Sequence, residues 1–360
     1  MRTVRFLWIG VLSVVGLLSC TTNYYRIRTR IGSDDSFARE ICATGDSAFM
    51  AGDRTHSPYW FALDSSWHVI RYDSCFVQNF FGEERKMNVC AVRDFKSERG
   101  VLPPIEGMGK YHVTQPVETL DKSFRWFYTY YYYRAVYPEI TDKGPVPIDT
   151  YLTPQEQQIW FRSVEGAYRE MNGMELKSQL DDMEKNFWKW WIHTCFEISY
   201  DVVAHFDSLS GKSPYISRLA EVKDSLFRKY RNEGEDNFSP EDVCRYLDCY
   251  WNTSHYSDLY RIYGEEMSDR FDEKSATSLL FETCIRYEVV LPGRLCSTNA
   301  PFVEDDVPVW KVDAFRFFTG DYVLTAQSRQ VNGWAFGVTL LLLSGVIVYC
   351  LNRLRRYRRK

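Results

Sequence analysis

The sequence has few of the residues and motifs from which recognised enzyme sites are built. It contains only six histidines in 360 residues, which limits metal binding and acid–base chemistry near neutral pH. It has no glycine-rich phosphate loop and no His-Glu-x-x-His, Gly-x-Ser-x-Gly or Cys-x-x-Cys motif. These absences exclude the usual signatures of nucleotide-binding, metallopeptidase, hydrolase and redox sites. We therefore predict no catalytic residue, no metal ligand and no cofactor.

Basic residues do not outnumber acidic ones except at the two ends of the chain. The whole chain has a formal charge of −4, and removing two basic residues within 1–20 and six within 353–360 leaves −12 for the part between them. An acidic body argues against nucleic acid as a partner and against tight contact with anionic headgroups. Aromatic residues are abundant by contrast, at 16%.

A long uncharged run lies near the end of the chain. Trp334–Leu351 contains no charged residue, and at about 1.5 Å per residue it covers roughly 27 Å of a bilayer core about 30 Å thick. Six basic residues follow without an acidic one. We therefore predict a transmembrane helix at 333–352 and a basic cytoplasmic tail at 353–360.

Residues 1–20 have the pattern of an export signal. Arg2 and Arg5 precede an apolar stretch that is short for a membrane span. The stretch ends in Leu-Leu-Ser-Cys at Cys20, which resembles the bacterial lipobox, in which the cysteine is acylated. We predict a lipoprotein signal peptide with lipidation of Cys20; the alternative is an uncleaved anchor. Both place the ectodomain in the periplasm and the C-terminus in the cytoplasm, with the protein in the bacterial inner membrane.

This topology places the exported part in an oxidising compartment, where disulfides can form. We expect one or two, with Cys75–Cys90 the favoured pair. Cys244 and Cys249 are five residues apart in a predicted helix and point in different directions, so we expect no bridge between them. Cys195 lies in an apolar helix stripe and is expected to be a small buried side chain.

The predicted secondary structure divides the ectodomain into a β-rich part at 21–141, a helical part at 142–280 and a membrane-proximal β module at 281–332. The most aromatic predicted strand is Phe124–Tyr137. Aromatic residues favour strands, and we expect this one in the core with cover on both faces. The alternative is that one face lines a groove for a hydrophobic ligand.

The helical part shows clear start signals and one long periodic pattern. Thr153-Pro154-Gln155-Glu156 is a capping box, and apolar residues at steps of three and four predict a helix over Met174–Leu209. Strands before and after a helical block indicate an α+β fold. We predict an antiparallel sheet formed by N- and C-terminal strands, a central helical block and one C-terminal transmembrane helix.

The predicted long helix has two candidate functional sites. His193, Glu197, Asp201 and His205 follow at steps of four, but the first and last are about 18 Å apart along a helix, too far to share one ion. We expect a solvated stripe with charge pairs; the alternative is a metal site. The aromatic run Phe187–Trp191 is expected to pack under the sheet; the alternative is a partner or lipid surface.

The sequence of Val290–Arg329 is similar to that of known membrane-proximal modules. Its Pro-Gly turn after a strand, the Val309–Val312 strand with Trp310 and the strand that leads into the terminal helix resemble the membrane-proximal module of uncharacterised Bacteroidetes membrane-anchored lipoproteins. They are also distantly similar to the LppM-type lipoprotein module. The resemblance implies an α+β envelope protein with a curved antiparallel sheet, and it brings no catalytic residues.

Three functions remain open from the sequence. The preferred one is a non-enzymatic cell-envelope lipoprotein whose periplasmic ectodomain binds a protein or lipid-like partner, with the membrane itself as the other contact. The first alternative is a carrier of a hydrophobic ligand. The second is an unrecognised hydrolase or metal-dependent enzyme, which the missing motifs make the less favoured interpretation.

Overall fold

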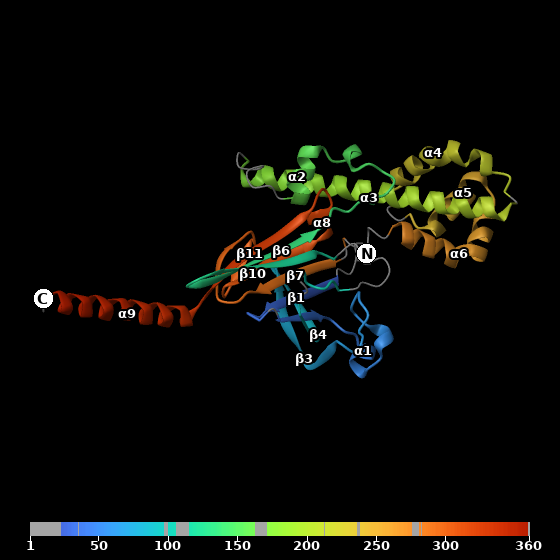
Figure 1. Ribbon diagram of the computed structural model, residues 1–360. Helices are drawn as coiled ribbons and strands as arrows, with labels where there is room; N and C mark the ends of the chain where they lie inside the picture. Colours follow the sequence, from blue (N-terminus) through green and yellow to red (C-terminus); the bar gives the residue numbers. More distant parts are fainter. Residues whose placement is uncertain are drawn as a thin grey trace, which may run out of the picture.

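The computed structural model describes residues 23–34, 36–96, 100–105, 115–162, 171–211, 213–235, 238–275, 281 and 283–358. The predicted signal peptide and Cys20 lie outside the described residues. Two β-sheets form the middle of the molecule (Figure 1). A helical block extends from one end of the sheets, and the helix that ends the chain projects from the other (Figure 1). The molecule is therefore elongated, with its helical block far from the terminal helix.

The larger sheet has seven strands in the order β3-β4-β2-β1-β7-β10-β9. The strands from the first part of the chain are β1 (Asn23–Ile31), β2 (Ser36–Ala43), β3 (His68–Phe80) and β4 (Glu83–Lys96). Those from the last part are β7 (Thr283–Val290), β9 (Phe302–Glu304) and β10 (Val307–Asp313). The two ends of the ectodomain meet where β1 pairs with β7 in parallel. This pair departs from the all-antiparallel arrangement expected from the sequence.

The smaller sheet has four antiparallel strands in the order β5-β6-β11-β8. They are β5 (Val117–Arg125), β6 (Tyr128–Tyr137), β8 (Arg294–Thr298) and β11 (Tyr322–Val331). The strand predicted at Phe124–Tyr137 is wrong in its extent, because the chain turns at Trp126 and Phe127 and β5 pairs back onto β6. The aromatic run is thus the tip of a hairpin followed by a core strand.

The main hydrophobic core lies between the two sheets. Along β6 the inward side chains of Tyr131, Tyr133 and Tyr137 are fully buried, whereas Tyr132 between them is exposed. This alternation is that of a strand with one face on the core and one face toward solvent. The core position expected for the aromatic strand is confirmed, but cover on both faces is not found.

A single long helix links this core to a second one. The helix α3 (Gly173–Ser210) has 38 residues, or about 57 Å at 1.5 Å per residue. Its capping box is formed by Asn172 and Glu175. Phe187 and Trp190 in its first half join the core between the sheets, as expected, while Trp188 is exposed. The second half is the spine of the helical block.

The remaining helices are short or pack around α3. The capping box predicted at Thr153 and Glu156 is present at the start of its helix. Ser239 and Asp242 form another before a helix with proline in its first turn. These two helices and the others of the ectodomain are α1 (Ser47–Ala51), α2 (Pro154–Arg162), α4 (Leu219–Asn232), α5 (Pro240–Trp251), α6 (His255–Lys274) and α8 (Ala314–Phe317).

The final helix, α9 (Gly333–Tyr357), is long and apolar enough to cross a membrane. Its apolar side chains are exposed along most of its length, as a lipid-facing helix requires. The predicted fold class is confirmed: an α+β ectodomain with sheets built from both ends of the chain, a helical block and one C-terminal apolar helix.

The predicted Cys75–Cys90 bridge is wrong. The disulfide joins Cys42 to Cys90, and Cys75 is a free, exposed thiol. The reason is strand register, because β2 and β4 are antiparallel and place Cys42 directly opposite Cys90. Cys244 and Cys249 are both free, in agreement with the sequence-based expectation.

Candidate functional site at the base of the terminal helix

The strand β11 continues into α9 through one residue, Asn332, without a flexible linker. The backbone N–H of Asn332 donates to the carbonyl of Phe127 at 2.9 Å. Its side-chain amide donates to the carbonyl of Trp126 at 3.1 Å and to that of Arg125 at 3.4 Å, and it accepts from the Thr129 hydroxyl at 3.0 Å. One asparagine therefore ties the tip of the β5–β6 hairpin to the start of α9.

Aromatic rings reinforce this connection. The indole N–H of Trp126 donates to the Thr339 hydroxyl at 2.8 Å, so the hairpin tip reaches two turns into α9. The ring of Trp126 also meets that of Trp334 edge-on at 5.4 Å, and Phe124 stacks against Trp334 at 6.1 Å. Such pairs contribute about 0.5–1.5 kcal/mol each beyond their area burial. The tip and the helix are held as one unit.

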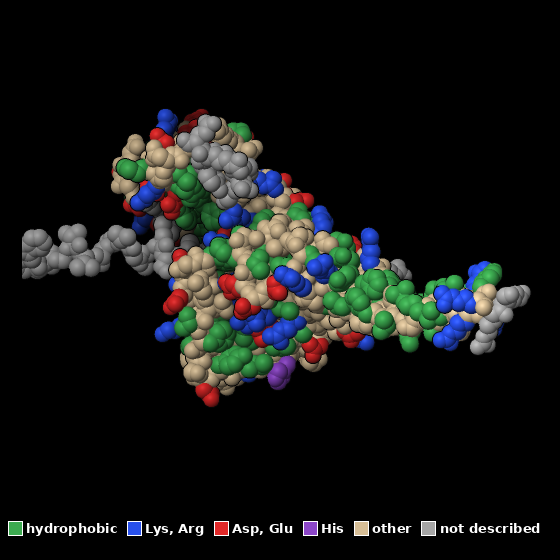
Figure 2. Space-filling view, turned by 90° about the vertical axis from the view of Figure 1, so that its left-hand side faces the viewer, with side chains coloured by type: hydrophobic (Ala, Val, Ile, Leu, Met, Phe, Trp, Pro, Cys, Tyr) green, Lys and Arg blue, Asp and Glu red, His purple; other side chains and the backbone are tan. Residues whose placement is uncertain are grey.

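We call the rings at this junction the aromatic collar; its members are Phe124, Trp126, Phe127, Trp334 and Phe336. Although they touch one another, Phe124 and Trp126 remain 58% and 43% exposed. Figure 2 shows hydrophobic side chains continuing from the body onto the base of the helix. Large exposed apolar patches of this kind mark interaction surfaces.

Three exposed arginines lie close to the collar. Arg125 belongs to the hairpin, and Arg329 on β11 pairs in register with Arg294 on β8. The turn before β8 approaches β11 closely: Gly293 has φ +78°, and a Cβ there would lie 2.2 Å from the carbonyl oxygen of Arg329. Only glycine fits this position without displacing the strand. The junction is locally basic although the ectodomain is acidic.

The structure places the four-residue stripe of α3 against α4. Lys223 of α4 forms an ion pair with Glu197 and contacts Asp201 at 3.4 Å, and His193 lies 3.6 Å from Glu197. Burial raises the pKa of the Glu197 carboxyl, but hydrogen bonds from His193 and Lys223 outweigh it, so its pKa is lowered. The stripe joins two helices through charge pairs, while His205 contacts a neighbouring ring.

A second histidine pair was not foreseen from the sequence. Asp207 on α3 is fully buried, and its carboxylate meets the His255 ring at 2.7 Å and the Tyr256 hydroxyl at 3.4 Å. The partners are 48 residues apart, and no motif marks either of them. The contact fastens α6 to α3 inside the helical block.

A buried ion pair lies in the core between the sheets. Arg39 of β2 meets Glu118 of β5, and the hydroxyls of Tyr133 and Tyr287 both donate to the same carboxylate. Burial raises the pKa of both tyrosines, so both remain hydrogen-bond donors. The space beside this group, which Tyr137 also lines, has a volume of about 20 Å³, far below the 300–1,000 Å³ of ligand pockets.

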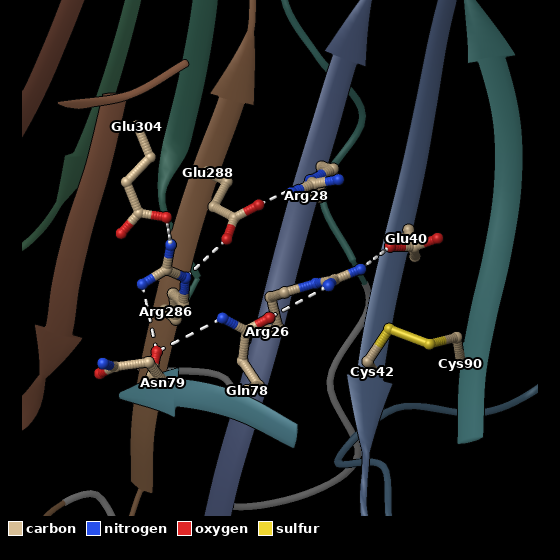
Figure 3. A network of polar contacts seen from close by, with 10 residues as sticks. All are labelled: Arg26, Arg28, Glu40, Cys42, Gln78, Asn79, Cys90, Arg286, Glu288 and Glu304. Atoms are coloured by element: carbon tan, nitrogen blue, oxygen red, sulfur yellow. Dashed lines mark hydrogen bonds and ion pairs between the residues drawn. A yellow bond between two sulfur atoms is a disulfide. The ribbon is translucent and has the colours of Figure 1, made fainter. Parts of the chain in front are cut away.

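The outer face of the larger sheet carries a second network (Figure 3). Arg286 donates to Glu288 at 2.6 Å, to Glu304 at 2.5 Å and to the carbonyl of Asn79 at 3.1 Å. Arg28 donates to the other oxygen of Glu288 at 2.6 Å. Each charge has an opposite partner, so the network fastens β9 and the end of β3 to the sheet.

One group of three potential metal ligands occurs within the described residues: Glu40, Cys42 and Cys90. Both sulfurs are joined in the disulfide, so neither can act as a thiolate ligand. Their proximity is explained by the bridge itself.

Comparisons with known proteins give little beyond the structure. No protein-family model matches the chain, and no curated protein matches it. Among solved structures, the folded domain of LppM from Mycobacterium tuberculosis, determined by NMR, is similar over 86% of this chain and 91% of its own, with 11% sequence identity and a TM-score of 0.25. The resemblance to Bacteroidetes lipoproteins stays a prediction.

Proposed function

We propose that this chain is a non-enzymatic, membrane-anchored protein of the cell envelope whose ectodomain binds a protein or lipid-like partner. The observation that carries the proposal is the rigid connection at Asn332. A body tied to its membrane helix keeps a fixed orientation, and this one holds its helical block at the end away from α9 (Figure 1). The topology proposed from the sequence places the ectodomain in the periplasm and the basic tail in the cytoplasm.

The helical block is the part we propose to meet the partner. The block has a hydrophobic core of its own, so apolar side chains on its surface do not result from the lack of a core. Four large apolar side chains of the block are nevertheless exposed, namely Leu209, Ile216, Tyr250 and Ile262. Exposed apolar and aromatic side chains supply much of the binding energy at protein interfaces.

The two alternatives have less support. A carrier requires a cavity against the aromatic strand, yet the inward side of β6 is packed and the space beside Tyr137 is about 20 Å³. A larger hollow of about 540 Å³ lies at the β1–β2 turn, away from that strand, and is open to solvent. A metal enzyme based on the α3 stripe would need free carboxylates, and Lys223 pairs with two of them.

A crosslinking experiment tests the proposal. A photoreactive amino acid replaces Ile262, which is 64% exposed on the helical block, and a matched control replaces Val77, which is 56% exposed on the sheet. We expect illumination of cells to give one discrete adduct, protein or lipid, from position 262 and none from 77. Equal, diffuse labelling at both positions, with no lipid in an extract of the purified protein, would count against a partner-binding block.

A further inference from the structure

We infer that the tip of the β5–β6 hairpin is a second membrane contact, in which Phe124, Trp126 and Phe127 lie in the lipid interface on the ectodomain side. The inference rests on the proposed membrane-spanning role of α9. It adds a lipid-binding surface to the ectodomain and fixes how the body sits on the bilayer. Four observations, on depth, backbone pairing, side-chain type and charge, lead to it.

The first observation concerns depth. The apolar run of α9 ends before Arg353, and a hydrocarbon core about 30 Å thick takes roughly 20 residues of helix. Counting back from Asn352 places the outer boundary near Gly333. Trp126 donates to Thr339, which lies six residues further in, or about 9 Å along the axis. A helix that spans the bilayer therefore keeps the backbone of the tip, which is tied to Asn332, at the boundary and directs this indole from there toward the hydrocarbon.

The second observation concerns the backbone of the turn. Backbone groups near hydrocarbon must find partners within the protein, because lipid offers none. The three successive carbonyls at the tip, those of Arg125, Trp126 and Phe127, all accept hydrogen bonds from Asn332. A turn that faced water would not need this pairing. The tip is thus able to enter an apolar environment without an unsatisfied carbonyl at these positions.

The third observation concerns the side chains. Turns are normally made of glycine, proline, asparagine, aspartate or serine, yet this turn consists of Trp126 and Phe127 with Phe124 beside it. Tryptophan concentrates at membrane–water interfaces because its ring is apolar and its N–H is polar. Here the N–H is satisfied by Thr339 and the ring stays exposed. One side of the ring packs against Trp334, and the exposed part faces the surroundings of α9.

The fourth observation concerns charge. Arg125, Arg294 and Arg329 are exposed next to the collar, and Figure 2 shows basic side chains beside the base of the helix. Arginine binds phosphate oxygens well, and the phosphates of a bilayer lie just outside the level of interfacial tryptophans. Arg329 and Arg294 lie on the body side of Asn332, whereas the rings of Phe124 and Trp126 contact α9, so this order of rings and arginines matches the order of acyl chains and phosphates in a leaflet.

The test uses the full chain labelled with 5-fluorotryptophan and incorporated into phosphatidylethanolamine–phosphatidylglycerol nanodiscs. The variants Trp126→Phe and Trp188→Phe assign two fluorine signals. Trp188 on α3 is the matched control, since it is 42% exposed against 43% for Trp126. We expect nitroxide lipids to broaden the Trp126 signal several-fold more than that of Trp188. A water-soluble gadolinium chelate should do the reverse.

The outcomes separate the two proposals. If the chelate broadens both signals equally while the chain co-elutes with the nanodiscs, α9 is in the membrane and the hairpin is not, so this inference is overturned alone. If the chain does not co-elute with the nanodiscs, the membrane-anchored function fails and this inference with it. A Trp126 signal affected by nitroxide lipids and protected from the chelate supports both.

Discussion

The buried Arg39–Glu118 pair gives the most quantitative prediction for the fold. Gln has nearly the same shape as Glu but no charge. Replacing Glu118 by Gln therefore leaves the Arg39 guanidinium buried without an anion. Losing one partner of a buried pair costs about 3–5 kcal/mol, because the remaining charge is uncompensated. The hydroxyls of Tyr133 and Tyr287 lose a charged acceptor as well. We therefore expect the free energy of unfolding to fall by about 3–5 kcal/mol.

The assay is urea unfolding of the full chain in detergent micelles, followed by tryptophan fluorescence. The control is Glu139→Gln, which breaks an exposed pair with Lys143 at 2.6 Å and should cost less than about 1 kcal/mol. A double variant, Arg39→Met with Glu118→Leu, removes both charges of this pair and should be more stable than Glu118→Gln. A loss for Glu118→Gln no larger than that of the control would show that the buried charge is not what stabilises this site.

Three further predictions concern the disulfide, acid pH and the anchors. Replacing Cys42 and Cys90 by alanine should lower the free energy of unfolding by about 4 kcal/mol, because the bridge spans 48 residues; a loss under about 1 kcal/mol in the same assay would contradict this. The lowered pKa of Glu197 means that its pair with Lys223 stabilises the fold above the unfolded pKa of about 4.3 and ceases to do so as pH falls through the folded pKa. Lys223→Met should therefore lower Tm at pH 7, and this loss should shrink as the pH is lowered step by step below about 4.3; a loss of Tm unrelated to pH would contradict a contribution from the pair. Cys20→Ala should leave the protein resistant to carbonate extraction, since a transmembrane helix anchors far more strongly than acyl chains, and its release would assign the anchoring to Cys20.

The lipid anchor predicted at Cys20 restricts the orientation of the body. β1 runs parallel to β7, whose far end leads through Gly293 to the junction with α9. Asn23 therefore begins β1 at the opposite end, about 26 Å away along the strand. Cys20 precedes Asn23 by three residues, which span at most about 10 Å. Acyl chains on Cys20 can share the bilayer of α9 only if the larger sheet lies inclined toward the membrane.

Local signals in the sequence were reliable because local physics decides them. The predicted helix Met174–Leu209 matches α3 within one residue at each end, since apolar periodicity indicates a helix without reference to the rest of the chain. The apolar run of α9 is equally self-contained. The bounds of α3 and the start of α9 could be predicted, whereas α9 continues to Tyr357, five residues beyond the predicted end at 352.

Long-range features could not be predicted in the same way. The parallel pairing of β1 with β7 joins segments some 260 residues apart, and no local pattern selects it. The disulfide followed from the β2–β4 register, which also could not be derived from cysteine spacing. The turn at Trp126 was missed because it contains no turn-forming residue, and its aromatic side chains suggested a continuous strand. The same anomaly is what marks it as a lipid-binding tip.

We propose that α9 crosses a membrane with the folded body on one side and the basic tail on the other. The most direct test is labelling with a membrane-impermeant maleimide in sealed right-side-out vesicles. We expect the exposed thiol of Cys249 in the helical block to react at once, and a cysteine introduced by Arg356→Cys to react only after permeabilisation. Labelling of both positions in intact vesicles would contradict this.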